Sequence, residues 1–594
     1  EKAGSDKPVK RLWLSSMEPD EIRKAYANLR PGAEYDNLYA AALCRAKADW
    51  LVGMNATRLM SLVYHRTLNV GRVVSPTLSL LVERKREIEE FKPETFYTVA
   101  ANCGGVFLSS ERIADKSEAE ALANDCTGEA HIIRVGHEKC SKRAPELYDL
   151  TTLQREANRE LGFTAQQTLD YLQALYEKRL VTYPRTDSRY LTDSMAATVP
   201  ELMSVAARLL EVEAPVDINA EQVCDSSKVT DHHALLPTEE PVELWRLTGP
   251  ERNIYDLIVR RFLAVLLPPF EYEEVALTLE VEGETLHARG KAVLSPGWRA
   301  AYDRTFALEE EDEEGDEKEQ SLPTLAEGER LTVQSARANP GKTAPPKRYT
   351  EATLLTAMEH PAAQVADREQ GRILEETGGL GTPATRADII EKLFSAFYIE
   401  RRGRELVPTS KGRQVVELAP ADLRSAQLTA RGEKRLGDIA RGLERESAFV
   451  SEMRGYASRL VGEVKTSDAV YRHDNVTREK CPDCGKFLLA VQGKRGKMLV
   501  CPDRECGYRR SVTRTTNARC PNCHKKMELR GEGEKQLFAC VCGYRERLSD
   551  FKKRHAHSAA GKRDVQRFLQ NQREEKGTSA MAEQLKKWLE QQEK

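Results

Sequence analysis

The sequence lacks long hydrophobic runs. The run Phe262–Pro268, for example, falls far short of the roughly 18 apolar residues that a helix needs to cross a bilayer. The sequence also lacks a signal-like start, in which basic residues precede an apolar stretch. Aromatic residues make up only 6% of the chain, whereas charged residues make up 31%. These features exclude a helical membrane protein and indicate a cytoplasmic one.

Cysteine is scarce over most of the chain. Of the 13 cysteines, five are scattered before residue 480 and eight lie within residues 481–542. Scattered cysteines in a cytoplasmic protein are usually unreactive thiols of the core. The clustered eight therefore need a separate explanation.

The clustered cysteines form two repeated units. Each unit has a Cys-x2-Cys pair, sixteen further residues and a second pair, and the first three cysteines of the two units are offset by 39. Four thiolates at this spacing predict one tetrahedral Zn²⁺ site per unit. Modules of this size hold no core without the ion, so we expect the zinc to be structural. The predicted ligands are Cys481, Cys484, Cys501 and Cys506 in the first unit and Cys520, Cys523, Cys540 and Cys542 in the second.

Charge is unevenly distributed along the chain. The net charge is only −2, yet residues 478–594 hold 28 Lys and Arg against 15 Asp and Glu. A basic C-terminal part suggests a polyanion as partner. The acidic run Glu309–Glu319 is expected to be a solvated loop, because consecutive carboxylates without strand or turn context rarely form a metal site. At 594 residues the chain exceeds the roughly 250–300 residues of a single core, so several domains are expected.

Apolar spacing separates helical from strand-like parts. The sequence predicts short strands within residues 11–16, 97–135 and 273–295, and helices over residues 18–29, 35–64, 150–161, 164–180, 251–267 and most of 348–464. Thr151 and Thr164 are each followed three residues later by Gln, which predicts a capping box at both. The Gly-rich loop 378–381 runs into a helix at about Ala384 and is a weak sign of anion binding.

The stretch VTYPRTDSRYL, residues 181–191, carries the clearest chemistry. Tyr183 follows a helical pattern, and Pro184 biases it away from helical geometry. A phenol with an arginine two residues on, at Arg185, suits attack on a phosphodiester, because a guanidinium disperses charge on the phosphate oxygens. The alternative from these residues alone is an aromatic at a helix end among solvated charges. The later pair His232 and His233 cannot both face one site on a strand, so one can reach a phosphate while the other is structural.

Five segments together resemble motifs of the type IA DNA topoisomerases, in that family's order. They are RAKADWLVGMNATR (45–58), GRVVSPTL (71–78), YPRTDSRYL (183–191), DHHALLPT (231–238) and GGLGTPATRADIIEKLF (378–394). The resemblance is closest to bacterial topoisomerase III, and the two four-cysteine units are typical of its Bacillus-like form. It extends from Lys10 to the tail.

The resemblance implies a multidomain α+β fold. The family core is a torus of helical gate domains, a winged-helix or CAP-like tyrosine domain and a β-rich arch, here followed by two zinc ribbons. The implied boundaries are 1–16 for the end of a Toprim domain, 17–75 and 341–470 for the helical DNA-binding domain, 76–148 and 246–340 for the arch, 149–245 for the tyrosine-bearing lid, 478–512 and 517–550 for the ribbons, and 551–594 for a basic tail.

The resemblance also implies a mechanism and its residues. Tyr183 resembles the nucleophile that forms a 5′-phosphotyrosine link, Arg185 the arginine that stabilises the scissile phosphate, and His232 a histidine that contacts it. The cut strand is held while a second strand passes and is then religated, without ATP, so that negative supercoils relax and linked DNA separates. Further positions match motif residues that support the site or line the single-strand groove: Arg45, Asp49, Arg58, Arg72, Thr186, Asp187, Ser188, Arg189, His233, Thr385 and Arg386.

One part of the family pattern has no match. The family's Toprim domain supplies a Glu as acid/base, a Lys and a DxDxE cluster for Mg²⁺, and no such pattern precedes Arg11. We therefore expect the Mg²⁺ ligands of the full enzyme to be absent from these 594 residues. The chain by itself is expected to bind DNA and to cleave it poorly.

The implied partners are single-stranded and negatively supercoiled DNA, with a RecQ-type helicase or a single-strand-binding protein as protein partner. The resemblance further implies a monomer associated with the nucleoid. The competing hypothesis is a noncatalytic protein that binds single-stranded nucleic acid through its zinc ribbons, in which Tyr183 has no chemical role.

Overall fold

The computed structural model divides the chain into two compact units, Glu1–Tyr471 and Arg472–Lys594. It describes residues 7–13, 19–210, 218–229, 231–281, 283–302, 320, 322–361, 372, 378–472, 475–493, 496–503, 506–521, 526–530, 536–540 and 544–553. Within the described part, the first unit contains three hydrophobic cores and the second contains two small ones.

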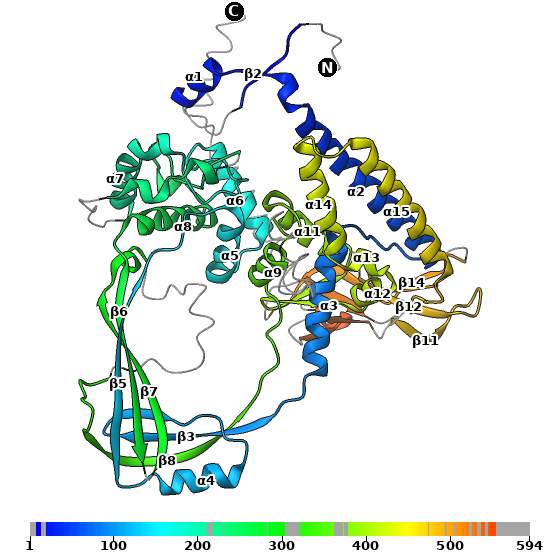
Figure 1. Cartoon of the computed structure of the whole chain (residues 1–594). Helices are drawn as coiled ribbons and strands as arrows, with labels where there is room; N and C mark the ends of the chain where they lie inside the picture. The colour runs from blue at the N-terminus through cyan, green and yellow to red at the C-terminus, as the bar shows by residue number, and fades with distance from the viewer. Residues whose placement is uncertain are drawn as a thin grey trace, which may run out of the picture. The chain divides into compact units, whose positions relative to one another are not determined.

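The first core is helical and is organised by α2 (Asp36–Val63). Its residues Cys44, Ala48 and Val52 recur every four positions and are buried against α14 and α15, which lie alongside α2 in Figure 1. The other elements of this core are α3 (Val74–Glu90), α9 (Glu351–Glu359), α11 (Pro383–Ser395), β9 (Ile399–Arg402), β10 (Glu405–Pro408), α12 (Ser410–Leu418), α13 (Ala421–Arg424), α14 (Gln427–Ala440) and α15 (Glu446–Thr466).

The second core surrounds the stretch with Tyr183. Helix α5 (Leu150–Leu161) and helix α6 (Ala165–Glu177) precede that stretch, and α7 (Val199–Leu209) and α8 (Gly249–Leu266) follow it. Short 3-10 turns fill the connections: η2 (Asp193–Ala197), η3 (Ala220–Val223), η4 (Ser226–Lys228), η5 (Leu244–Arg246) and η6 (Gly297–Ala301).

The third core fills a closed antiparallel barrel with strand order β3-β4-β7-β6-β5-β8 (Figure 1). Along β3 (Thr95–Cys103) the residues Val99, Ala101 and Cys103 face inward at the two-residue period of a strand. The remaining strands are β4 (Val106–Ser109), β5 (Glu129–Lys142), β6 (Phe270–Val281), β7 (Glu284–Ser295) and β8 (Arg330–Lys342), with α4 (Lys116–Asp125) packed against β3 and β8. Closure leaves no free sheet edge.

The N-terminal part is small. A two-residue pairing joins β1 (Lys10–Arg11) to β2 (Arg30–Pro31) around α1 (Pro19–Ala27), and the 3-10 turn η1 (Gly32–Tyr35) leads into α2. The strand predicted over residues 11–16 is thus shorter, and residues 14–16 lie outside the described part.

The second unit consists of two four-stranded antiparallel sheets with the simple orders β11-β12-β13-β14 and β15-β16-β17-β18. Their bounds are β11 (Val476–Lys480), β12 (Phe487–Gly493), β13 (Gly496–Val500), β14 (Arg509–Ser511), β15 (Thr513–Arg519), β16 (Lys526–Arg530), β17 (Leu537–Ala539) and β18 (Arg545–Arg547). The repeated cysteine spacing therefore corresponds to a repeated sheet.

The multidomain α+β architecture predicted from the sequence is confirmed, with one difference in helix capping. The capping box at Thr164 forms, but the one at Thr151 does not, because Asp149 caps α5 by accepting from the backbone N–H of Thr152. Helix α3 packs in the first core through Leu78 and Leu81. Helix α8 packs in the second core, where Ile258 and Phe262 are buried.

Candidate active site and zinc site

The backbone on either side of Tyr183 is fixed by the segment that carries the two histidines. Val181 pairs with Pro237, and the Thr182 N–H donates to the Leu236 carbonyl at 3.0 Å. The Thr182 hydroxyl donates to the Ala234 carbonyl at 3.1 Å and accepts from the Leu236 N–H at 2.9 Å. Two motifs that lie about fifty residues apart are thereby joined beside the phenol.

The Tyr183 ring lies between two other aromatic rings. The His232 imidazole is 4.2 Å away between centroids at 39°, and the edge of Tyr176 on α6 meets it at 5.6 Å and 85°. Tyr183 itself is half-buried. A phenol that is packed between two rings and is still partly exposed can meet a substrate that arrives from solvent.

Arg185 is the exposed cation next to this ring. Its Nη1 donates to the Gln173 side-chain oxygen at 3.5 Å, at the outer limit of a hydrogen bond. Within the part of the chain that the structure describes, Arg185 makes no ion pair to a carboxylate. Its charge is therefore available to an incoming anion.

Thr186 and Ser188 hold the loop from inside. The buried Thr186 hydroxyl donates to the His232 carbonyl at 3.0 Å, and its own carbonyl accepts from the Leu150 N–H at 3.1 Å. The buried Ser188 hydroxyl contacts the carbonyls of Tyr190 and Lys228 at 3.2 and 3.0 Å. Asp187, between them, is exposed.

The two histidines have different environments. His233 is buried, its Nδ1 lies 2.9 Å from the Ala234 carbonyl, and burial lowers its pKa. His232 instead packs on Tyr183. The structure thus separates the pair as the adjacency argument requires, with His232 at the phenol.

Arg189 and Arg386 converge on one carboxylate, that of Glu359 at the end of α9. Glu359 lies 3.8 Å from Arg189, 3.6 Å from Arg386 and 3.0 Å from Arg155 of α5. Arg189 also pairs with Asp149 at 2.9 Å. Arg386 is only 1% exposed and donates to the Thr151 hydroxyl at 2.9 Å and the Gly378 carbonyl at 2.6 Å. Burial lowers the pKa of Arg386, and Glu359 opposes that shift.

Two predicted groove residues of α2, Arg45 and Asp49, form a second charged group with Arg72, which precedes α3. Arg72 is buried, and its Nε donates to Asp49 at 2.8 Å while its Nη2 lies 3.5 Å from Glu433. Glu433 also pairs with Arg45. Arg58, farther along α2, is exposed, as is Thr385, whose hydroxyl bonds to the Thr382 carbonyl at 3.0 Å.

The Gly-rich loop before α11 has a structural reason for its glycines. Gly379 adopts φ +75°, and a Cβ there would lie 2.2 Å from the Met358 carbonyl oxygen. The loop is therefore pressed against the end of α9, and Leu380 N–H donates to the same carbonyl at 2.6 Å.

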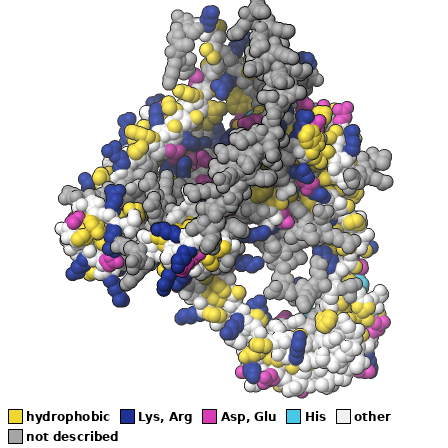
Figure 2. Space-filling view, turned by 180° about the vertical axis from the view of Figure 1, so that it is seen from behind, with side chains coloured by type: hydrophobic (Ala, Val, Ile, Leu, Met, Phe, Trp, Pro, Cys, Tyr) yellow, Lys and Arg dark blue, Asp and Glu magenta, His cyan; other side chains and the backbone are white. Residues whose placement is uncertain are grey.

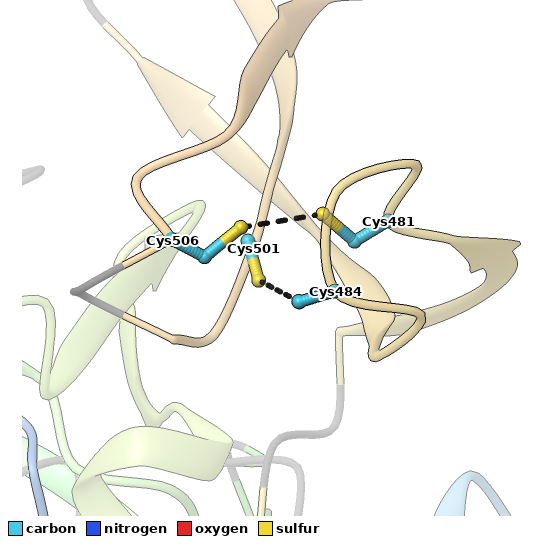
Figure 3. Close-up of side chains that lie close together, drawn as sticks. All are labelled: Cys481, Cys484, Cys501 and Cys506. Atoms are coloured by element: carbon cyan, nitrogen blue, oxygen red, sulfur yellow. Dashed lines mark hydrogen bonds between the residues drawn. The ribbon is translucent and has the colours of Figure 1, made fainter.

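The first cysteine unit forms a compact thiol cluster, shown in Figure 3. The sulfurs of Cys481, Cys484, Cys501 and Cys506 all lie within 4.8 Å of one another. The pairs Cys481–Cys506 and Cys484–Cys501 are 3.5 and 3.4 Å apart. A tetrahedral Zn–S bond of about 2.3 Å sets sulfur separations of about 3.8 Å, so these residues fit a zinc ion.

The second cysteine unit is described only in part. Cys520 and Cys540 are buried and pack in one small core with Met527 and Phe538. Cys523 and Cys542 lie outside the described residues. Zinc in this unit stays a prediction.

Several residues of the site were not singled out by the sequence. The sequence could have indicated Gln173 and Tyr176, since they lie on the predicted helix that leads into Tyr183. Glu359 and Glu433 carry no such signal, because each is an ordinary helical glutamate whose partners include arginines more than 150 positions away.

Surface charge alone does not mark the site, because Lys and Arg side chains are spread over the visible face among acidic ones (Figure 2). Among the described helices, none is long and apolar enough to cross a membrane.

Comparison with known proteins decides the family. The family described as DNA topoisomerase matches residues 33–451, well over half of the chain. DNA topoisomerase 3 of Bacillus licheniformis is 49% identical over 612 residues, which cover 99% of this chain and 83% of that protein. The chain belongs to the type IA DNA topoisomerases, and it is similar to topoisomerase III.

Further relatives agree with this assignment. DNA topoisomerase 3 of Bacillus subtilis (strain 168) is 46% identical over 607 residues, covering 99% of this chain and 83% of that protein. Among solved structures, full-length topoisomerase I from Thermotoga maritima has a TM-score of 0.61 at 26% identity, covering 84% of this chain and 80% of the other. The topoisomerase fold, the isomerase class and DNA as the substrate therefore apply to this chain.

Proposed function

We propose that Tyr183 is the nucleophile by which this topoisomerase cuts a single DNA strand. The observation that carries the proposal is the placement of a half-buried phenol between His232 and Tyr176, with Arg185 beside it, which pairs with no carboxylate among the described residues. The family assignment supplies the reaction class, and this geometry supplies the candidate residues.

The chemistry is a transesterification. The Tyr183 oxygen attacks the phosphorus, a tyrosyl O–P bond forms to the 5′ phosphate, and the P–O bond to the 3′ oxygen breaks. The phenol proton is lost to a base, and the 3′ oxygen gains a proton as it leaves. Arg185 binds the phosphate oxygens and His232 donates a hydrogen bond to them, which stabilises the charge that develops there.

Religation reverses these steps, so the 3′ hydroxyl attacks the phosphotyrosine and releases Tyr183. The number of phosphoester bonds is the same before and after, so no ATP is needed. Passage of a second strand between the two events would relax negative supercoils and separate linked DNA.

The DNA-binding residues of this proposal fall into two groups. Arg58, Thr385 and Asp187 are exposed and can meet a strand directly. Arg45, Asp49 and Arg72, and likewise Arg189 and Arg386, lie in ion-pair networks in the structure. An arginine in these networks can bind DNA only if a DNA phosphate takes the place of its carboxylate partner. The buried residues Thr186, Ser188 and His233 do not meet DNA in this proposal and support the loop from inside.

Two metals have different roles in the proposal. Zinc would be held by the four cysteines of each ribbon and would stabilise its fold. Mg²⁺ would assist cleavage by neutralising phosphate charge. In the described residues the only cluster with metal-binding spacing is Cys481, Cys484, Cys501 and Cys506.

We further propose that residues 1–594 cleave DNA poorly by themselves. No two aspartates of the sequence are separated by a single residue, so the DxDxE pattern is missing. Without a general base and a bound cation near the phenol, which ordinarily titrates near pH 10, attack at neutral pH is slow.

Negatively supercoiled and single-stranded DNA would still bind, a helicase or single-strand-binding protein would be a partner, and the protein would act at the nucleoid.

The test uses an end-labelled single-stranded oligonucleotide with Mg²⁺ and denaturing gels to detect the covalent adduct. Replacing Tyr183 by Phe is expected to abolish the adduct while leaving oligonucleotide affinity within about two-fold, since the ring packing is retained. Tyr190→Phe, a second tyrosine of the same loop, is the control. An adduct that survives Tyr183→Phe would support the noncatalytic hypothesis, and a robust adduct from residues 1–594 would contradict their predicted low activity.

A further inference from the structure

Helix α6 contacts two of the three residues that the proposed cleavage uses, Tyr183 and Arg185. Tyr176 meets the Tyr183 ring edge-on at 5.6 Å, and Gln173 accepts a hydrogen bond from Arg185 at 3.5 Å. Residues three positions apart lie on one face of a helix, so α6 presents these two side chains together. The nucleophile and the phosphate clamp thus share a single supporting surface.

The backbone next to Tyr183 is already fixed, so support from α6 can act only on the orientation of the ring. With Val181 and Thr182 paired to the 234–237 segment, the remaining freedom lies in the side-chain torsions. Tyr176 and His232 border the ring at different angles, 85° and 39°, and so restrict those torsions. A reacting atom displaced by about 1 Å can cost on the order of a hundredfold in rate.

Gln173 acts on Arg185 in a different way. A neutral amide oxygen at 3.5 Å orients the guanidinium without neutralising it. Arg189, by contrast, is bound to the carboxylates of Asp149 and Glu359. A phosphate oxygen can therefore displace Gln173 from Arg185 at little cost, because a charge-assisted hydrogen bond is stronger than a neutral one.

Helix α6 is itself rigidly held. Its first turn is closed by the reciprocal capping box of Thr164 and Gln167, and its inner face buries Leu172 and Leu175. At its end Leu180 N–H donates to the Leu175 carbonyl at 3.0 Å, and the chain passes directly into Val181. The contacts at Gln173 and Tyr176 are thus transmitted from a fixed element.

We propose that Tyr176 and Gln173 are positioning residues, which hold the Tyr183 phenol and the Arg185 guanidinium for attack on the phosphate. This inference rests on the proposed function of Tyr183 and adds the residues that prepare it. Neither side chain is proposed to touch the reacting atoms.

The first test reads the position of the phenol without requiring cleavage. The full chain is labelled with 3-fluorotyrosine, and the ¹⁹F resonance of Tyr183 is identified by its loss in Tyr183→Phe. Tyr176→Leu is expected to shift and broaden that resonance, whereas Tyr176→Phe, which keeps the ring edge, leaves it in place. An unchanged Tyr183 resonance in a folded Tyr176→Leu protein overturns the proposal.

The second test follows the slow adduct formation of residues 1–594 over long incubations with saturating labelled oligonucleotide, and each variant is compared with the unmodified chain. Tyr176→Leu is expected to lower the initial rate by about tenfold to a hundredfold while the Kd for the oligonucleotide stays within about two-fold, and Tyr176→Phe restores the rate. Gln173→Ala is expected to lower the rate, and Asp170→Ala, at an exposed position of α6, to leave it unchanged. If Tyr176→Phe lowers the adduct rate as much as Tyr176→Leu, or if Tyr176→Leu changes only the Kd, the positioning role is contradicted. If an adduct still forms with Tyr183→Phe, the proposed function itself is contradicted.

Discussion

At the scale of single residues, arginines of the same motif regions differ in what they are free to bind. Among the residues that the structure describes, Arg185 contacts the neutral side chain of Gln173 and no carboxylate, whereas Arg189 is held by carboxylates and Arg386 is almost fully buried beside Glu359. Their positions in the motifs do not predict this difference. Exposure and the charge of the partners show that Arg185 can contact DNA directly, whereas Arg189 and Arg386 would first have to leave their present partners.

The buried His233 gives a pH prediction. Burial lowers its pKa below the ordinary value near 6.5, so the folded protein favours the neutral ring. The stability that this neutral ring contributes is present above pH 6.5 and is lost as the pH falls from there toward the lowered folded value. We expect His233→Gln to be less stable than the unmodified chain at pH 7.5 and to lose less of its Tm on acidification to pH 5.

The matched control for this prediction is His131→Gln, which replaces an exposed histidine on β5. Thermal unfolding at several pH values is the measurement. A Tm that falls equally steeply with pH in His233→Gln and in the unmodified chain would show that another group governs acid stability.

At the scale of elements, α9 makes polar contacts with α5 and with the start of α6, although these contacts join two hydrophobic cores. Glu351 of α9 accepts from the Ala165 N–H at the start of α6 at 2.8 Å, and Ala352 N–H donates to Asn158 of α5 at 3.1 Å. Arg155 and Arg386 meet at Glu359. Such a contact can separate in water more readily than an apolar one, because its charged groups regain hydration when they part.

Glu359→Ala tests how far this contact depends on one carboxylate. Removing it leaves Arg155 and Arg386 buried without their shared partner, for which a loss of about 3 kcal/mol is expected. Hydrogen exchange measured by mass spectrometry should accelerate in α5 and α9 before the barrel strands respond. Glu120→Ala, which breaks the exposed Lys116 pair of α4, should change stability little, because water screens that pair. An equal effect of both changes would argue against the contact.

The elements also show what the sequence could predict. Periodicity located α2, α5, α6 and the strands of the barrel, because their buried positions recur at helical or strand spacing. The five motifs singled out Tyr183 and His232, whose rings pack together in the structure, and the cysteine spacing singled out the four thiols that cluster in the first unit. Barrel closure and the partners Glu359 and Tyr176 could not be predicted, because they depend on which distant segments pack together.

At the scale of the whole molecule, the two units differ in what stabilises them. The first has three cores, each built from many large apolar residues. The cores of the second contain a few residues each and include cysteines of the two repeats. A core of that size cannot offset the entropy of ordering the chain without additional links, which the proposed thiolate–zinc bonds would supply.

Zinc removal should therefore affect the two units separately. On treatment with a strong chelator, we expect residues 472–553 to become sensitive to protease while the first unit keeps its far-ultraviolet helix signal, since α1 to α15 all lie in that unit. Affinity for single-stranded DNA should fall, because the basic ribbons lose their fixed surface. Cys484→Ser, in the first ribbon, should reproduce part of the effect without chelator, whereas Cys140→Ser, a cysteine of the barrel, should not. Loss of the helix signal on chelation would show instead that the two units depend on each other for folding.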